Sequence, residues 1–143
     1  MALKRCPNGS VGVIIENSLG HILLIDRATF PYGYAAPAGH TEIGEAPEDA
    51  ARREVVEEVG LTLQDLTLVW RGVIQNPCRR GYDEHEWWVY RAKAPELARV
   101  RIDKNAARSA RWVNLEDLAT LAAVPPGLEK VWQEHFKRLG YAQ

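Results

Sequence analysis

The sequence is poor in cysteine, and this shortage restricts the class of protein. Its 143 residues include only two cysteines, Cys6 and Cys78. They form no CxxC pair and have no histidine pair close by in the sequence, so the spacing argues against a zinc site. A chain of this length can bury a sufficient core without a disulfide. Free cysteines suit a reducing compartment, so we expect a cytoplasmic protein.

The sequence also lacks long hydrophobic runs and a strong charge of either sign. The apolar run at residues 11–15 ends at Glu16, whereas a membrane-spanning helix needs about 20 apolar residues. The net charge is -1 and the pI is about 6.4. Such a balance gives no strong electrostatic attraction to nucleic acid or to an anionic membrane. We therefore expect neither a membrane nor a nucleic-acid partner.

The remaining composition is that of an ordinary globular domain. The chain is 46% hydrophobic and 26% charged, which makes global disorder improbable. No repeat, low-complexity tract or long linker interrupts it, so we predict a single domain over residues 1–143.

Hydrophobic patterning predicts strands first, one helix inserted between them, and helices at the end. This order is typical of an α+β domain with helices packed on a mixed sheet. The expected elements are a hairpin at 10–28, a short strand within 32–40, a helix at 47–59, one or two strands at 61–75, a strand at 84–94, a strand and a helix at 109–122 with Asn114 as cap, and a closing helix at 125–140.

The end of the helix at 47–59 gathers three carboxylates, Glu54, Glu57 and Glu58, at spacings of three and four residues. Neighbouring like charges repel on a helix, and the negative end of the helix dipole disfavours them further. Three interpretations are open: a solvated charged face, partial neutralisation by Arg52 and Arg53, or a divalent cation held by the carboxylates.

The surrounding sequence, GHTEIGEAPEDAARREVVEEVGL, resembles the signature box of the Nudix hydrolases. The nine constrained positions of that box all match here over 23 residues, which is far more specific than a short motif. The matching residues are Gly39, Glu45, Arg53, Glu54, Val55, Glu57, Glu58, Gly60 and Leu61. The order of elements around the box is also similar to the family's α/β/α sandwich, in which the box forms a loop, a helix and a loop.

The resemblance implies metal-dependent hydrolysis of a nucleoside diphosphate linked to another group. Glu54, Glu57 and Glu58, with the backbone carbonyl of Gly39, would hold Mg²⁺ or Mn²⁺, while Arg53 would orient the cluster through Glu45. We expect Glu57 or Glu58 also to handle the attacking water as general base.

Two departures from the family pattern affect these expectations. Ala46 stands where many boxes carry serine or threonine, so the helix should lack a side-chain cap. The loop before the strand at 109–113 has Asp103 but no carboxylate from Asn105 to Ser109, which moves the choice of a distant base toward the acidic residues Glu84, Glu86 and Glu96.

The substrate is less well defined by the sequence. Tyr34 and Trp87, with Trp88, are candidates to stack on a base, although aromatic residues in strands more often belong to a core. Arg27 is a candidate phosphate ligand; further candidates are Arg79 and Arg80 for phosphate, His40 and His85 for structural hydrogen bonds, and Pro77 as a feature of ADP-ribose hydrolases in the family.

We expect a small nucleotide or diphosphate substrate, most simply a nucleoside di- or triphosphate. The alternatives are an ADP-ribose or nucleotide-sugar pyrophosphatase and a Nudix domain that binds a nucleotide without cleaving it. The sequence leaves the oligomeric state open, with a homodimer as one option.

Overall fold

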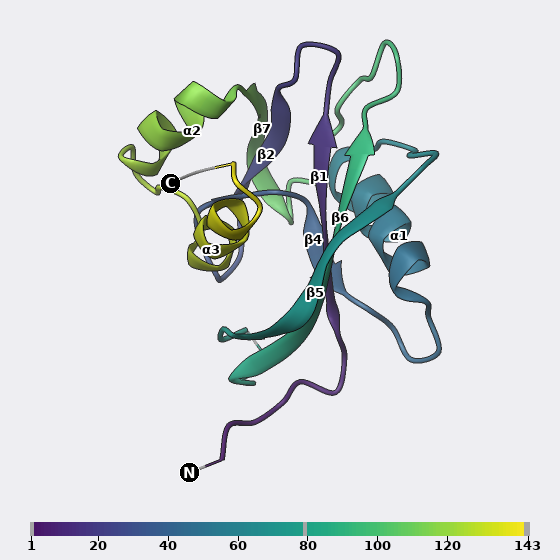
Figure 1. The fold of residues 1–143 in the computed structure, drawn as a ribbon, viewed down its shortest axis with the longest axis vertical. Helices are drawn as coiled ribbons and strands as arrows, with labels where there is room; N and C mark the ends of the chain where they lie inside the picture. Colours follow the sequence, from purple (N-terminus) through teal and green to yellow (C-terminus); the bar gives the residue numbers. More distant parts are fainter. Residues whose placement is uncertain (1, 79, 142–143) are drawn as a thin grey trace.

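The computed structural model describes residues 2–78 and 80–141. Within these residues a mixed seven-stranded sheet lies between helices on its two faces (Figure 1). The predicted α+β class and α/β/α layering are therefore confirmed. In the described part of the chain, no helix is both long enough and apolar enough to cross a membrane.

The elements follow one another in the predicted order. They are β1 (Ser10–Glu16), β2 (Ile22–Arg27), β3 (Tyr34–Ala35), β4 (Ala38–His40), α1 (Pro47–Val59), β5 (Thr67–Gln75), β6 (Glu84–Lys93), β7 (Ala107–Val113), α2 (Leu115–Ala122) and α3 (Lys130–Arg138).

Strand β1 is the centre of the sheet. It runs antiparallel to β2 and β4 and parallel to β6, and β5 extends the sheet beyond β6. Ser10, at the start of β1, lies opposite His40 of β4 and Trp87 of β6. The sheet thus brings the beginning of the glutamate-rich box beside the beginning of β6.

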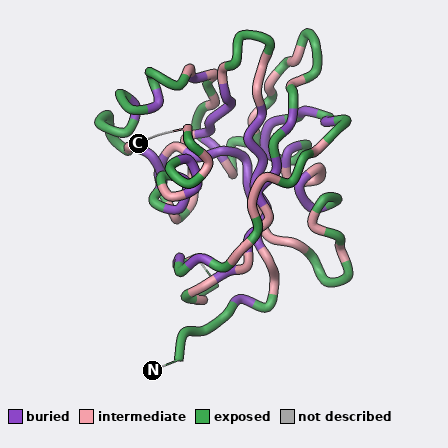
Figure 2. The backbone as a smooth tube through the Cα atoms, in the orientation of Figure 1, coloured by how far each residue is buried: buried purple, intermediate pink, exposed green. Residues whose placement is uncertain are grey.

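Two hydrophobic cores occupy the two faces of the sheet. One lies under α1 and includes Val55 and Val59, while the other lies under α2 and α3 and includes Trp132 and Phe136. Figure 2 shows the buried segments gathered along the sheet and the facing sides of the helices, with residues 2–5 and the loop tips mostly exposed.

Helix α1 has the predicted limits, and Ala51, Val55 and Val59 form its buried stripe at helical spacing. Pro47 occupies its first turn, where the missing N–H costs nothing. Ala46 makes no side-chain cap, as expected, and Gly60 ends the helix in the left-handed conformation, with φ of 71°. The helix also buries Glu58, so part of the carboxylate cluster faces the protein interior.

Two sequence-based boundaries were wrong. The single strand predicted within 32–40 is split into β3 and β4, which pair with different strands, β2 and β1. The closing helix begins at Lys130, later than predicted, because residues 123–127 form turns and Gly127 has a φ of 73°. Glu129 caps this helix by accepting a hydrogen bond from the Trp132 amide at 3.2 Å.

Candidate active site

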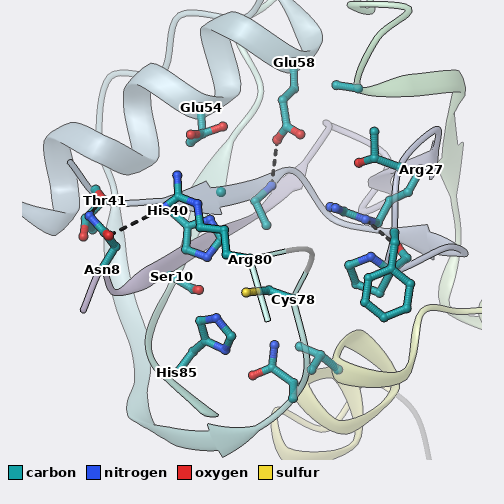
Figure 3. A pocket seen from close by; sticks show the side chains of 18 of the residues that line it. Asn8, Ser10, Arg27, His40, Thr41, Glu54, Glu58, Cys78, Arg80 and His85 are labelled. Atoms are coloured by element: carbon teal, nitrogen blue, oxygen red, sulfur yellow. Dashed lines mark hydrogen bonds between the residues drawn. The ribbon is translucent and has the colours of Figure 1, made fainter. Parts of the chain in front are cut away.

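A cavity of about 620 Å³ lies beside the carboxyl-terminal half of α1 and the strand β4 (Figure 3). This volume is in the range of small-molecule sites. Seven of the nine main site residues predicted from the sequence line it: Arg27, Gly39, Arg53, Glu54, Glu57, Glu58 and Trp87. Two others, Tyr34 and Glu45, are not among its lining residues.

Glu58 is a buried carboxylate on the inner side of α1. Its residue is 7% exposed, and Oε1 accepts a hydrogen bond from the Ala38 amide at 2.8 Å, as Figure 3 shows. Burial raises the pKa of Glu58 to about 8, and the charge of Glu54 adds to the rise. The cavity wall therefore carries a carboxyl group, that of Glu58, whose ionisation at neutral pH is disfavoured by its surroundings.

Glu54 lies against Gly39 on the opposite strand. A Cβ atom at position 39 would collide with the Glu54 carboxylate, so the absence of a side chain is required for this approach. Burial raises the pKa of Glu54 to about 7; Arg53 opposes the rise, and Glu57 adds to it. The glycine of the box thus makes room for a carboxylate beside the β4 backbone.

Glu57 is more exposed than Glu54 and Glu58. Its side chain is 55% exposed and lies 3.3 Å from Nη1 of Arg53. Glu57 therefore belongs to the rim of the cavity, while Glu54 and Glu58 belong to its wall.

Arg53 connects the box loop to the carboxylate cluster. Its Nε donates to Glu45 Oε2 at 2.8 Å, and Nη2 donates to Glu45 Oε1 and to the backbone carbonyl of His40, each at 2.9 Å. Its Nη1 lies 3.0 Å from Glu54 Oε1. The predicted pairing of Arg53 with Glu45 is thus present in the geometry, together with a backbone contact that the sequence did not indicate.

Two arginines from outside α1, Arg27 and Arg80, bring positive charge to the cavity wall. Arg27 lines the cavity, and its Nε donates to the Pro31 carbonyl at 2.6 Å. Arg80 also lines it, and its Nη1 donates to Asn8 Oδ1 at 3.2 Å. Arg79, the third arginine considered from the sequence, lies outside the described residues. Two arginines thus line the same cavity as Glu54 and Glu58.

Three acidic residues that sequence reasoning did not favour line the cavity: Glu42, Asp103 and Glu129. Asp103 lies in the loop before β7, where its amide donates to the Glu58 carbonyl at 3.0 Å and its Oδ1 accepts from the Asn105 amide at 3.0 Å. Glu129 is 5% exposed, and burial raises the pKa of its carboxyl. The sequence signal for Asp103 was its place before a strand; Glu129 had none, because its cavity contact depends on the turn before α3.

The acidic residues that the sequence favoured as distant bases lie elsewhere. Glu84 pairs with Arg5 at 2.7 Å, and Glu86 pairs with Arg71 at 3.0 Å. Neither lines the cavity, and Glu96 lines a separate hollow near β6. The geometry gives these three residues no access to the cluster on α1, which corrects that expectation.

Two of the three candidate stacking residues, Trp87 and Tyr34, are mostly engaged in the core. Trp87 lines the cavity but is 6% exposed, and its ring packs edge-on to Trp132 and His135 at centroid distances of 6.1 and 4.7 Å. Its Nε1 donates to Asn76 at 3.2 Å. Tyr34 is half-buried against the core under α2 and α3. Little ring surface of Trp87 is available for a base, and Tyr34 does not reach the cavity.

The chain belongs to the Nudix family, as the sandwich fold and the glutamate-lined cavity on α1 suggest. A family model described as the NUDIX domain matches residues 7–135, which is most of the sequence and includes the complete box.

Curated relatives share parts of this sequence. An RNA pyrophosphohydrolase of Psychrobacter arcticus is 28% identical over 116 residues, which cover 72% of this chain and 66% of that protein. The human mitochondrial NAD(P)H pyrophosphatase NUDT13 is 51% identical over 57 residues, or 39% of this chain and 16% of that protein. The aligned segments thus span less than two thirds of either relative.

Solved structures share the fold over nearly the whole chain. The MutT protein from Methanosarcina mazei Go1 superimposes with a TM-score of 0.73 at 20% identity, covering 98% of this chain and 96% of that one. The NUDIX domain of Shewanella oneidensis NrtR, solved with ADP ribose, gives a TM-score of 0.70 at 15% identity, covering 97% and 90%. At these identities the likeness concerns the fold.

Proposed function

We propose that this protein is a divalent-metal-dependent hydrolase that cleaves a diphosphate bond in a small nucleotide-containing substrate. The observation that carries the proposal is the pairing of the half-buried Glu54 carboxylate with the buried Glu58 carboxylate, in a cavity that Arg27 and Arg80 also line. Their surroundings raise the pKa values of these two groups to about 7 and 8, which costs free energy of folding. Such perturbed carboxyl groups in a cavity are typical of functional sites.

The carboxylate set fits a hard divalent cation such as Mg²⁺ or Mn²⁺. Such ions prefer oxygen ligands, and Gly39 leaves the space into which the Glu54 carboxylate fits beside the β4 backbone. Glu54, Glu57 and Glu58, with the Gly39 carbonyl, would hold the ion. When bound, it would neutralise phosphate oxygens and lower the pKa of a coordinated water.

The protein's own residues would position the reaction. Arg53 holds Glu45, Glu54 and the His40 carbonyl in one arrangement, so it acts as a positioning residue for the cluster. Glu57 and Glu58 are the candidates for accepting the proton of the attacking water. Glu57 reaches solvent, and Glu58 has a pKa suited to proton transfer near neutral pH.

The arginines favour a substrate with several phosphate oxygens. Arg27 and Arg80 lie on the cavity wall, where guanidinium groups suit phosphate recognition. The names of the curated relatives, an RNA pyrophosphohydrolase and an NAD(P)H pyrophosphatase, agree with attack on a diphosphate bond. We infer a nucleoside di- or triphosphate, or a similar small diphosphate, as the substrate class.

ADP-ribose is a second candidate ligand, because Pro77 lines the cavity and a structurally similar NUDIX domain was solved with ADP ribose. It would serve either as a substrate or as a ligand that is bound without cleavage. This alternative shares the cavity with the main proposal and differs in the group beyond the second phosphate.

The test measures phosphate or nucleotide release with and without Mg²⁺ across nucleoside triphosphates, ADP-ribose, NADH, dinucleoside polyphosphates, nucleotide sugars and 5′-triphosphorylated RNA. Glu57→Gln and Glu58→Gln should each abolish most metal-dependent release from the preferred compound. Glu48→Gln, on the exposed side of α1, is the matched control and should retain it.

Full turnover in both cavity variants would overturn the proposal. Calorimetry with Mg²⁺ and the same compounds separates the alternatives. Stable binding of ADP-ribose without product would instead assign a ligand-binding domain.

A further inference from the structure

The fold brings one cysteine and two histidines together at the edge of the cavity. The Cys6 thiol and one ring nitrogen each of His40 and His85 lie within 4.8 Å of one another. These residues are far apart in the sequence, which is why their spacing argued against a zinc site. The histidine pair that the sequence lacked near its cysteines is supplied by the tertiary structure.

Sheet pairing explains this convergence. The amino-terminal segment runs beside β6, where the Cys6 amide donates to the Glu84 carbonyl at 3.0 Å, so Cys6 lies next to His85. Ser10 pairs with His40 and, on its other side, with Trp87. The backbone therefore fixes all three ligand-bearing positions.

His85 is the least easily explained member of the group. It is 0% exposed, and neither of its ring nitrogens makes a well-formed hydrogen bond with the described residues. Burial lowers its pKa, the Asn76 backbone opposes this effect, and Arg80 adds to it. A neutral imidazole buried without a good partner costs free energy, and neutral imidazole is also the form that binds metals.

The neighbouring groups are arranged around the same point. The ring of His40 lies 5.5 Å from that of His85, at an interplanar angle of 50°, and Cys6 is 4% exposed. Figure 3 shows His40 and His85 projecting from separate strands toward the cavity, apart from Glu58.

We propose that Cys6, His40 and His85 form a second metal site, which binds zinc or a similar borderline-soft divalent cation. A thiolate and two imidazoles are a typical ligand set for such ions, whereas magnesium prefers oxygen. Tetrahedral zinc with these ligands needs ligand atoms about 3.5 Å apart, and the three ligand atoms here lie within 4.8 Å of one another. The fourth position is left for water or another ligand.

This site shares no ligand with the carboxylate cluster but is mechanically linked to it. His40 follows Gly39, and its carbonyl accepts a hydrogen bond from Arg53 at 2.9 Å. A cation on Cys6, His40 and His85 would therefore tie the amino-terminal segment to the loop that carries the box.

Cobalt is the direct probe, because a thiolate bound to Co²⁺ gives charge-transfer absorption that carboxylate ligands do not. The whole 143-residue chain, stripped of metal and reduced, should show this absorption at one equivalent of Co²⁺, and Zn²⁺ should displace it. Cys6→Ser should lose the band. Cys78→Ser removes the other thiol, which lies outside the group, and should keep it.

Two further measurements distinguish this site from the carboxylate cluster and from a site on the other thiol. Glu54→Gln and Glu58→Gln should retain the cobalt band, because the site is independent of the carboxylates. Zn²⁺ should raise the melting temperature of the wild type and of Cys78→Ser, and the rise should disappear in Cys6→Ser. Melting curves in chelator verify that each variant folds. A band that persists in Cys6→Ser, or one lost in Cys78→Ser alone, would overturn the assignment.

Discussion

Arg53 and Glu45 form a two-point ion pair across eight residues of sequence, with Nε–Oε2 and Nη2–Oε1 distances of 2.8 and 2.9 Å. The hydrogen bonds from Arg53 lower the pKa of Glu45 to about 2. Glu45 thus stays charged at neutral pH and anchors the loop to the helix. The same guanidinium also donates to Glu54 and to the His40 carbonyl. One side chain thus connects the box loop, helix α1 and strand β4.

Arg53→Lys should reduce activity roughly 10- to 100-fold, the range seen when groups that orient metal ligands are changed. Lysine keeps the charge but cannot form the planar fork that contacts Glu45, Glu54 and the backbone together. Steady-state kinetics at varied Mg²⁺ concentration would measure this loss of activity. We expect the variant to need a higher Mg²⁺ concentration for half-maximal activity. The adjacent Arg52→Lys, whose partner Glu48 is exposed, should change neither activity nor metal requirement; equal losses in both variants would contradict the assigned role.

Gly39→Ala should remove most of the activity and leave the fold intact. The added Cβ meets the Glu54 carboxylate, which must then move away from the β4 backbone. Magnesium binding, followed by calorimetry, should weaken along with turnover.

Gly44→Ala is the matched control in the same loop. Nothing lies within 4 Å of a Cβ there, but the φ of 79° is unfavourable for alanine. This variant should lose about 1 kcal/mol of stability and keep its activity. The opposite result, inactivity at 44 with normal turnover at 39, would show that the contact at Gly39 is not required.

The metal-free protein should become less stable as pH rises from 6.5 to about 8. The pKa values of Glu54 and Glu58 are raised from 4.5 to about 7 and 8 by burial, so the folded state holds protons that the unfolded state has released. By linkage the free energy of unfolding then falls with rising pH in this window. We expect a loss on the order of 2 kcal/mol.

Urea unfolding in chelator at several pH values would measure this loss. Glu58→Gln should flatten the profile, because its amide does not titrate. Saturating Mg²⁺ should also reduce the loss, since a cation compensates the ionised carboxylates. A wild-type profile as flat as that of the variant would contradict the buried-carboxylate interpretation.

The box could be predicted from sequence because its constraints are local. The limits of α1, the stripe of Ala51, Val55 and Val59, and the left-handed Gly60 all follow from helical periodicity and end signals. The pairing of Arg53 with Glu45 also lies within this segment. Short-range spacing was therefore sufficient for the helix, and the resemblance of this same segment to the Nudix box implied the candidate metal site.

The remaining lining of the cavity depends on contacts between distant segments. Asp103 reaches Glu58 through a backbone hydrogen bond, and Cys6 meets His85 through strand pairing. Trp87 was considered for stacking because alternation along a strand does not reveal which face a helix will cover, and α3 covers that ring with Trp132. Such placements follow from sheet order, which the sequence patterns did not specify.

His135→Phe should stabilise the protein, and more so at acidic pH. His135 is 1% exposed, neither ring nitrogen has a hydrogen-bond partner among the described residues, and the rings of Trp70, Trp87 and Trp132 surround it. Burial, with a contribution from Arg138, lowers its pKa from 6.5 to about 3. Below pH 6.5 the unfolded chain therefore binds a proton at His135 that the folded protein does not bind. The free energy of unfolding consequently decreases as the pH is lowered.

Phenylalanine has no such proton, so its advantage should grow by about 1.4 kcal/mol for each pH unit below 6.5. Urea unfolding of both proteins at pH 7.5 and 5.5 would measure this difference. The same stability difference at the two pH values would show that His135 is protonated in the folded state.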